Sequence, residues 1–343
     1  MISVVIPNYN GGATIGACLD AVFSSDSPEF EVIVVDDGSD DGSPDIVRLY
    51  PCRLVTLPGR RGTARARNVG AARSRGETIF FTDADCLVGK DTIRRAAESL
   101  AAHGPHVVMG GTYSSVPADS GFYSFFQSVF INYHETHSGE APDYVAAHAM
   151  VVDAGTFRKS GGFSEDFLPI IEDVEYSHRL RRSGVRLVMD AGIQVSHIFD
   201  FSLPRSLRNA FRKAFYWTIY SSRNGDLLAD SGTASRGLKA NAAIQALCIA
   251  ALLLSVVSGA PGASAILLPA ILINFLVNQG LVRAFFRSGG RLFGAKACLY
   301  YFSIFPMAAA VGGLAGWLRL FRQELFHETG MQWRFHRSGT QDQ

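Results

Sequence analysis

Two aspartates that follow a short apolar segment are the first residues of this chain whose type and spacing suggest chemistry. The segment is Thr78–Phe81, which is typical of a strand buried in a sheet, and Asp83 and Asp85 come directly after it. Side chains two residues apart in extended backbone point to the same side, so both carboxylates can face one ligand. Paired carboxylate oxygens suit Mg²⁺ or Mn²⁺ holding a diphosphate. An isolated Asp-x-Asp is common in surface turns, but the carboxyl end of a buried strand favours a ligand site.

Three further motifs in the first part of the chain carry polar side chains at predicted strand or helix ends. They are Pro7-x-Tyr9-Asn10, Asp36-Asp37-Gly38-Ser39 and Ala66-Arg67-Asn68. Proline fixes φ in the first turn, and acids after the second strand can accept hydrogen bonds from a ribose or a base edge. Arginine and asparagine near a helix start can contact phosphate and the adjoining nucleoside. Either of the first two motifs alone is more typical of a plain turn or an Asx-turn.

A second acidic pair, Glu172 and Asp173, follows the apolar residues Leu168–Ile171. Acids in a first helical turn also interact favourably with the helix macrodipole, so the pair alone does not separate a catalytic from a structural role. His197 follows another predicted strand, and a lone histidine in such a place is more often structural. His148 lies where we expect an acceptor pocket, although a buried core position is the stronger expectation.

Strand and helix signals alternate through the first hundred residues. Strands are predicted at Ser3–Ile6, Glu31–Val35, Arg53–Leu57, Thr78–Phe81 and His106–Met109, and helices at Thr14–Ser24, Ser43–Leu49, Thr63–Ser74 and Lys90–Ala102. This alternation predicts an α/β fold with a mostly parallel sheet. Residues 112–147 break the rhythm and are rich in aromatic and small polar residues, so we interpret them as an insertion shaped to an acceptor.

Taken in order and spacing, these motifs resemble the family 2 glycosyltransferases of the GT-A fold, and the resemblance covers roughly residues 1–200. It implies a nucleotide-sugar-binding domain with a nucleotide half (about 1–110) and an acceptor half (about 111–200). The resemblance implies Asp173 as the catalytic base and Glu172 as a residue that orients the acceptor. It also implies a Mn²⁺ or Mg²⁺ cofactor held by Asp85, Asp83 and His197. The implied nucleotide-sugar-binding residues are Pro7, Tyr9, Asn10, Asp36, Asp37, Arg67, Asn68, Asp83 and Ala84.

Composition narrows the class of protein. The chain has 343 residues and a formal net charge of +1, so no global field favours nucleic acid. Its five cysteines are scattered without a Cys-x-x-Cys pair, which favours neither a zinc site nor a disulfide framework and fits a reducing compartment. The amino terminus lacks a basic segment before its apolar run, so a first strand is predicted there instead of a signal peptide.

The last third of the chain predicts membrane association. Ala240–Val282 holds 43 residues without a charged side chain, enough for two spans, and the uncharged stretch Ala297–Leu318, 22 residues long, forms either a third span or an interfacial segment. Ahead of them, Leu203–Ser222 predicts an amphipathic helix in the headgroup layer, with an ordinary core-facing helix as the alternative. Its apolar sector holds Leu207, Phe211, Ala214, Phe215 and Thr218, and its basic sector holds Arg205, Arg208, Arg212 and Lys213.

Charge predicts the topology. The basic residues Arg283, Arg287, Arg291 and Lys296 lie between the second and third candidate spans, which places that loop and the amino-terminal domain in the cytoplasm. Three spans would leave the basic residues of the tail on the far side, a conflict that the sequence does not resolve. The predicted organisation is a catalytic domain (1–200), an interface segment (201–238), a membrane region of two to three helices (239–318) and a polar tail (319–343). The expected location is the cell inner membrane.

The predicted function is metal-dependent, inverting transfer of one sugar from a nucleotide-sugar donor to a lipid-linked or membrane-proximal hydroxyl or phosphate. Membrane lipids are expected partners and nucleic acid is not. A processive polysaccharide synthase is an alternative, but no Gln-x-x-Arg-Trp motif follows the acidic pair. A catalytically silent nucleotide-binding scaffold is a second alternative, which the intact acidic motifs disfavour. A small transporter is disfavoured because the apolar stretches lack ionisable residues.

Overall fold

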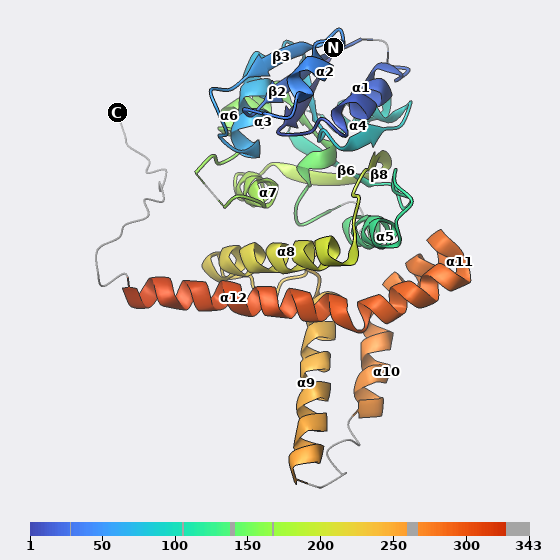
Figure 1. Ribbon diagram of the computed structural model, residues 1–343. Coiled ribbons are helices and arrows are strands. Elements are labelled where there is room, and N and C mark those ends of the chain that lie inside the picture. The colour runs from blue at the N-terminus through green and yellow to red at the C-terminus, as the bar shows by residue number, and fades with distance from the viewer. Residues whose placement is uncertain (28, 105, 138–140, 167, 259–266, 327–343) are drawn as a thin grey trace.

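The computed structural model (Figure 1) describes residues 1–326 except 28, 105, 138–140, 167 and 259–266. Eight strands form one sheet in the order β3-β2-β1-β4-β7-β6-β8-β5. The strands are β1 (Ile2–Asn8), β2 (Phe30–Asp36), β3 (Arg53–Thr56), β4 (Thr78–Phe81), β5 (Cys86–Val88), β6 (Val107–Tyr113), β7 (Met150–Asp153) and β8 (Arg186–His197).

The helices of the rounded domain alternate with these strands, and the helices after β8 lie beneath it (Figure 1). The first group is α1 (Ile15–Phe23), α2 (Ser43–Val47), α3 (Thr63–Arg73), α4 (Thr92–His103), α5 (Phe122–Thr136), the 3₁₀ turn η1 (Ala147–Ala149), α6 (Ala154–Lys159) and α7 (Glu172–Arg182). The second group is α8 (Leu203–Asn224), α9 (Arg236–Ser258), α10 (Leu267–Val277), α11 (Gln279–Tyr301) and α12 (Ile304–Phe326).

The first half of the sheet is parallel and buried on both faces. Strands β1, β2 and β4 consist mainly of β-branched and aromatic residues, most of which have almost no exposed surface, as expected for strands covered by helices on each side. Because β1 pairs in parallel with both β2 and β4, the carboxyl ends of the three strands lie at one edge. Asn8 is opposite Asp36 in this register, and the segment that contains Asp83 leaves β4 at the same edge.

The second half makes the sheet mixed. Strand β7 is antiparallel to β4 and β6, and β5 is antiparallel to β8. The predicted α/β class is confirmed; the antiparallel strand β7 follows the part of the chain where the sequence rhythm breaks, whereas β5 precedes it and was not predicted. The β5–β8 register places Cys86 directly opposite His197, so residues more than a hundred positions apart meet at the edge that the aspartates occupy.

Helices α8 and α12 lie side by side across the base of the rounded domain (Figure 1). Their backbones approach closely at two glycines of α12, because a Cβ at Gly312 would lie 2.2 Å from the Phe211 carbonyl oxygen and one at Gly316 would lie 2.4 Å from that of Phe215. Glycines four residues apart form the kind of stripe that permits such packing. The apolar sector predicted to enter the headgroup layer therefore packs largely on α12. An amphipathic pattern does not specify what covers its apolar face, and attachment of α8 to the headgroup layer stays a prediction.

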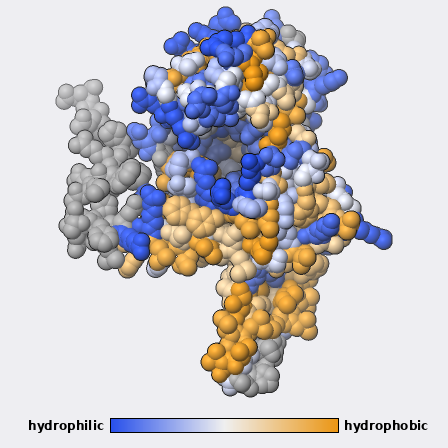
Figure 2. Space-filling model, in the orientation of Figure 1, coloured by the Kyte–Doolittle hydropathy of each residue, from blue (hydrophilic) through white to orange (hydrophobic). Residues whose placement is uncertain are grey.

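Helices α9 and α10 project away from the domain, nearly perpendicular to α8 and α12 (Figure 1). Leucine, isoleucine and valine side chains of α9 are exposed along its length, and Figure 2 shows this projection in the hydrophobic colour while hydrophilic residues gather on the rounded domain. Two helices are long and apolar enough to cross a membrane by length and composition, Arg236–Ser258 and the continuous stretch Gln279–Arg322. The second stretch contains both α11 and α12.

The candidate third span, Ala297–Leu318, is divided between α11 and α12. The chain turns at Phe302 and Ser303, and the two helices leave this turn in different directions (Figure 1). A straight span of the whole stretch is therefore absent from the described structure. The interfacial alternative agrees better with α12 lying along α8.

Buried amides hold the base of the α9–α10 projection. Asn241 of α9 donates a hydrogen bond to the Tyr301 carbonyl oxygen over 2.8 Å and accepts one from Asn274 of α10 over 2.7 Å. Asn278 continues the network, since its side-chain oxygen accepts a hydrogen bond from the Tyr301 hydroxyl over 2.8 Å. Buried amides with satisfied partners fix the helices at their junction without introducing charge.

Neighbouring glycines of α12 provide a test of the α8–α12 contact. Replacing either Gly312 or Gly313 by alanine should add about 1 kcal/mol of helix propensity. A Cβ at Gly312 meets a backbone oxygen, whereas one at Gly313 lies 3.2 Å from the Thr218 hydroxyl, which can rotate. We expect Gly312→Ala to destabilise the full chain by about 1–3 kcal/mol, the usual cost of overpacking, and Gly313→Ala to leave it unchanged or more stable. Thermal unfolding in detergent measures both, and equal melting temperatures for the two variants would contradict the contact.

Candidate functional site

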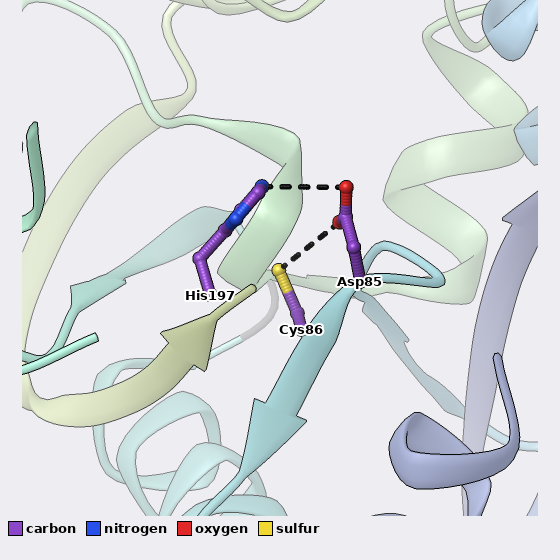
Figure 3. Close-up of side chains that lie close together, drawn as sticks. All are labelled: Asp85, Cys86 and His197. Carbon is purple, nitrogen blue, oxygen red and sulfur yellow. Dashed lines mark hydrogen bonds and ion pairs between the residues drawn. The ribbon is translucent and has the colours of Figure 1, made fainter. Parts of the chain in front are cut away.

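Asp85, Cys86 and His197 form a cluster at the carboxyl edge of the sheet (Figure 3). One potential ligand atom from each residue lies within 4.8 Å of the others. The His197 Nε2 atom is 3.4 Å from an Asp85 carboxylate oxygen, and the two side chains point toward one another from β8 and from the turn before β5. The backbone fixes this meeting, because the Ile198 amide donates to the Asp85 carbonyl oxygen over 2.8 Å.

The imidazole of His197 is held in place by aromatic rings. Phe199 stacks on it with ring centroids 4.0 Å apart, and Tyr113 contacts its edge at 5.0 Å. Burial lowers the pKa of His197 to about 4, with the charge of Asp83 opposing the shift. The ring is therefore neutral near pH 7, which is the form that ligates a metal. Its Nδ1 atom is buried and has no hydrogen-bond partner among the described residues.

Asp85 and Cys86 differ in their suitability as ligands. The Asp85 side chain is 41% exposed, and its surroundings raise its pKa to about 7, first through burial of the carboxyl group and then through the charge of Asp83. A bound cation would favour its ionised form. Cys86 is fully buried, and burial raises its thiol pKa well above the ordinary value, so it remains a thiol that donates to Asp85. A carboxylate and a neutral imidazole fit a divalent cation with open positions for ligand oxygens, and the thiol does not.

Asp83 turns away from this cluster and pairs with Arg67. The guanidinium of Arg67 donates to Asp83 over 2.6 Å and to Glu172 over 2.5 Å, and only 5% of its side chain is exposed. Burial opposes ionisation of Asp83, but the Arg67 charge outweighs it and holds the pKa of Asp83 below its ordinary value. The predicted set of Asp83, Asp85 and His197 is thus only partly brought together. Sequence spacing places both aspartates after one strand but does not specify their partners.

The second acidic pair begins α7 beside this ion-pair network. Burial raises the pKa of Glu172, and the adjacent Asp173 adds to the shift although Arg67 opposes it. Asp173 accepts hydrogen bonds from the Ala147 amide over 3.0 Å and from its own neighbour Val174 over 2.9 Å. These amides fix the carboxylate and leave acceptor positions on both oxygens. The candidate base therefore has a defined orientation at the acceptor side of the site.

The acids after β2 are used within the protein. Asp36 is 1% exposed and accepts hydrogen bonds from Asn8 over 3.0 Å and from the Ser39 hydroxyl over 2.5 Å. Asp37 accepts from the Arg61 and Gly62 amides over 2.6 and 2.8 Å, which fixes the start of α3. Their predicted contacts with a nucleotide must therefore act through acceptor positions not used by these bonds.

The turn after β1 presents one exposed ring. Tyr9 is 41% exposed, and the Arg60 guanidinium lies 4.4 Å from its centroid. Asn10 has a φ of 52°, and its backbone and side chain bond to Ser39 and Asp40. Pro7 is the last but one residue of β1 and lies opposite Val35. Tyr9 is therefore placed to line a ligand, while Pro7 and Asn10 shape the turn.

Asn68 is hydrogen-bonded within the protein, and its contact with a nucleotide stays a prediction. Its side-chain nitrogen donates to the Phe163 carbonyl oxygen and to Glu165, each over 2.8 Å, and its side-chain oxygen accepts from the Phe163 amide over 2.9 Å. It therefore clamps the loop before α7 to α3. Ala84 lies between the two aspartates, with its side chain packed partly against the core. Neither side chain offers a free polar group toward the metal cluster.

Several site residues were missed from the sequence. Cys86 follows Asp85 directly, yet only the β5–β8 pairing brings it to His197. Glu135 was also missed: it accepts from Thr112 over 2.7 Å and lies 3.5 Å from His148, which is buried and stacks on Tyr113 at 3.9 Å. The sequence signal that could have identified Glu135 is an acidic residue within an aromatic-rich segment. These buried groups form the floor between the metal cluster and the helices below.

The structure is an α/β domain whose acidic motifs gather at one edge of the sheet, and comparison with known proteins specifies its family. Residues 3–150 match the model of the family described as glycosyl transferase family 2. Glycosyltransferase GlyG of Streptococcus pneumoniae serotype 4 (strain ATCC BAA-334 / TIGR4) is 30% identical over 130 residues, which are 36% of this chain and 43% of that protein. Glycosyltransferase AglE of Haloferax volcanii is 33% identical over 123 residues, which are 34% of this chain and 40% of that protein.

A solved structure agrees over most of the chain. The mannosyltransferase PcManGT from Pyrobaculum calidifontis, in complex with GDP-Man and Mn²⁺, superposes with a TM-score of 0.56 at 21% identity, covering 91% of this chain and 86% of that one. At this identity the likeness establishes the fold. The chain matches the family 2 glycosyltransferases over residues 3–150 and has the GT-A fold, so the resemblance recognised in the motifs is confirmed for that part of the chain. It spans less than half the length of the two curated relatives described above.

Arg67 provides a stability test with a matched control. Arg67→Met would leave Asp83 and Glu172 buried without their partner, and we expect it to lower the free energy of unfolding by about 3–5 kcal/mol. Arg65 also pairs with a carboxylate, Glu165, but its side chain is 49% exposed, so Arg65→Met should cost less than about 1 kcal/mol. The pKa of Asp83 is lower in the folded protein than its ordinary value. Its ion pair with Arg67 therefore stabilises the fold fully above the ordinary pKa, and this stabilisation is lost as the pH falls through the folded pKa.

Chemical unfolding of the full chain at neutral and acidic pH measures these differences. The gap between Arg67→Met and the unmodified protein should narrow on acidification. Equal stabilities for the Arg65 and Arg67 variants at neutral pH would contradict the role given to the buried network.

Proposed function

We propose that this protein transfers one sugar, with inversion, from a nucleotide-sugar to an acceptor at a membrane surface, in a reaction that depends on Mn²⁺ or Mg²⁺. The observation that carries the proposal is the Arg67 bridge between Asp83 and Glu172. It joins the turn that bears Asp85 to the helix that bears Asp173, so a cation ligand and a base belong to one rigid site. The structure of PcManGT in complex with GDP-Man and Mn²⁺ supports a nucleotide-sugar donor and a divalent cation.

The donor side would be formed by the carboxyl edge of β1, β2 and β4. Asp85 and His197 have the oxygen and nitrogen donors to hold the cation, which would supply Lewis-acid stabilisation of the leaving diphosphate. Tyr9 offers an exposed aromatic face for a nucleoside base, and Asp36, Asp37 and Arg67 hold the surrounding turns. Glu172, bonded to Arg67, would contribute to orientation of the acceptor.

Asp173 would act as the general base. The acceptor oxygen forms a bond to the anomeric carbon as the bond from that carbon to the diphosphate oxygen breaks, and the electron pair of the broken bond leaves with the diphosphate. When the acceptor is a hydroxyl, its proton passes to Asp173. Attack from the face opposite the leaving group inverts the anomeric centre. The hydrogen bonds from the Ala147 and Val174 amides hold the carboxylate ready for this transfer.

Membrane attachment would be through α9 and α10. At 1.5 Å per residue, the 23 residues of α9 extend about 34 Å, slightly more than the apolar thickness of a bilayer. The sequence resumes its apolar character in α10, which returns toward the domain. A two-pass hairpin places the basic residues of α11 and the arginines Arg319 and Arg322 of α12 on the side of the catalytic domain. It thereby removes the charge conflict that three spans create. A cytoplasmic domain at the inner membrane follows from this arrangement.

Two aspartate variants test the chemistry together. Asp85→Asn should abolish the Mn²⁺-dependent part of donor binding, because one cation ligand is lost. Asp173→Asn should leave donor affinity nearly unchanged and lower transfer by about 10²–10⁴-fold, the usual contribution of a positioned base. Screening the purified full chain against a panel of nucleotide-sugars with Mn²⁺ identifies the donor for these measurements.

Three measurements separate the outcomes: donor affinity by calorimetry, the rate of transfer, and the melting temperature. Unchanged Mn²⁺-dependent affinity in Asp85→Asn would remove that residue from the cation site. Near-normal turnover of Asp173→Asn with a small loss of stability would instead indicate that the acid only interacts with the helix macrodipole.

The two-pass topology can be tested by cysteine labelling in a background without the native cysteines. We expect Arg291→Cys and Arg322→Cys to react with a membrane-impermeant maleimide from the same side as Lys90→Cys of the catalytic domain. Val257→Cys, near the end of α9 away from the domain, should not react from that side. Labelling of Arg322→Cys from the opposite side to Lys90→Cys would mean that the chain crosses the membrane three times.

A further inference from the structure

An apolar pocket lies under the catalytic domain, at the base of α9. It has a volume of about 280 Å³ and is lined by residues of α5, α8, α9, α12 and the segment between α8 and α9. Phe130, Leu238 and Phe305 contribute apolar surface from three of these helices. The pocket is close to the lower size limit of small-molecule sites, and it adjoins the helices that we propose to contact the membrane.

The charged groups that line the pocket are cations, and its neutral polar lining residues include Gln127, Asn209, Thr218 and Thr233. Lys213 and Lys239 line it, and no aspartate or glutamate is among its described lining residues. Lys239 donates a hydrogen bond to the Ala229 carbonyl oxygen, whereas Lys213 has no hydrogen bond or ion pair with any described residue. Trp217 also lines the pocket and adds aromatic surface to it. An ammonium without a partner among the described residues, at the wall of a largely apolar cavity, complements an anion attached to an apolar chain.

Lys213 belongs to the predicted basic sector of α8, but it is less exposed than its neighbour Arg212. It is only partly exposed, and burial lowers its pKa while the charges of Glu135 and Asp173 oppose this shift. The pocket therefore lies within electrostatic reach of the candidate base. Packing agrees, because Trp217 shares a buried cluster with Val174, the residue that follows Asp173 in α7. One layer of side chains separates the pocket from the acceptor side of the site.

We propose that this pocket binds the apolar chain of a phosphate-linked lipid acceptor, with Lys213 contacting its phosphate. The inference rests on the proposed transfer reaction and specifies its acceptor. A hydroxyl of the headgroup beyond the phosphate reaches the site, gives its proton to Asp173 and bonds to the anomeric carbon. The bond from that carbon to the nucleoside diphosphate breaks, and its electron pair leaves with the diphosphate.

Photolabelling of the full chain in phosphatidylcholine nanodiscs tests the site. The probe is farnesyl phosphate with a diazirine on its chain, the corresponding alcohol is the comparison, and mass spectrometry maps the attachment. We expect the phosphate probe to label pocket residues such as Leu238 and Phe305, and farnesyl phosphate to compete while farnesol and inorganic phosphate do not. Mapping outside the pocket, or equal labelling by the alcohol, would overturn the proposal.

Two pairs of variants sharpen the test. Lys213→Gln should lower labelling at least about tenfold, as expected for a lost hydrogen bond to a charged group, while Arg212→Gln, an exposed neighbour outside the lining, should not. Ala242→Phe fills the pocket and should block labelling, whereas Ala243→Phe adds the same bulk on the exposed side of α9. Lys213→Arg retains the cation and should retain most labelling. Equal labelling of Lys213→Gln and Arg212→Gln, or of Ala242→Phe and Ala243→Phe, would contradict the site.

Two measurements separate this inference from the proposed function. Competition by phosphatidylglycerol as strong as that by farnesyl phosphate would mean that the pocket holds bulk membrane lipid, and the acceptor assignment would fall. Mn²⁺-dependent hydrolysis of nucleotide-sugars by the unmodified protein tests the donor chemistry without any lipid. Its absence for every donor would remove the proposed function, and with it the acceptor role, even if Lys213-dependent labelling were observed. Hydrolysis without pocket labelling would remove only the inference drawn from the pocket.

Discussion

The site depends on one buried cation. Arg67 lies between Asp83, which leaves the strand β4, and Glu172, which begins α7, and its side chain is almost completely covered. Taking three charges out of water is costly, and the cost is offset only while both ion pairs keep their geometry. The network therefore couples the turn that carries Asp85 to the helix that carries Asp173. Neither half of the site can shift far without leaving a buried charge unpaired.

The surroundings of Arg67 are arranged to keep that geometry. Asn68 holds the loop before α7 through three hydrogen bonds to Phe163 and Glu165, so α3 carries both the buried cation and the clamp that fixes its partners. Gly162 is needed there, because its φ of +68° is strained for other residues and a Cβ would lie 2.5 Å from the Asn68 side-chain oxygen. The asparagine thus stabilises the connection between α3 and the loop that precedes α7.

Below the domain, the helices are held together by close approach of their backbones. Gly312 and Gly316 let α12 lie directly on α8, and the asparagines at the base of α9 and α10 bind these helices together without ionised groups. This arrangement keeps α8 level with the acceptor side of the site. It also leaves Lys213 facing an apolar pocket instead of solvent. The two layers are therefore joined at the position where an acceptor drawn from a membrane would meet the catalytic groups.

The sequence by itself determined the α/β class, the domain family, the strands that precede each acidic motif and the apolar character of the last third. These properties depend on local patterns, since hydrophobic periodicity and motif spacing are written along the chain. Tertiary structure alone decided that Asp83 pairs with Arg67, that Cys86 meets His197, that Asn68 clamps a loop and that α12 covers the apolar face of α8. Each of these contacts joins residues from different elements, and a one-dimensional pattern specifies which face of a helix or strand is apolar but not which partner will cover it.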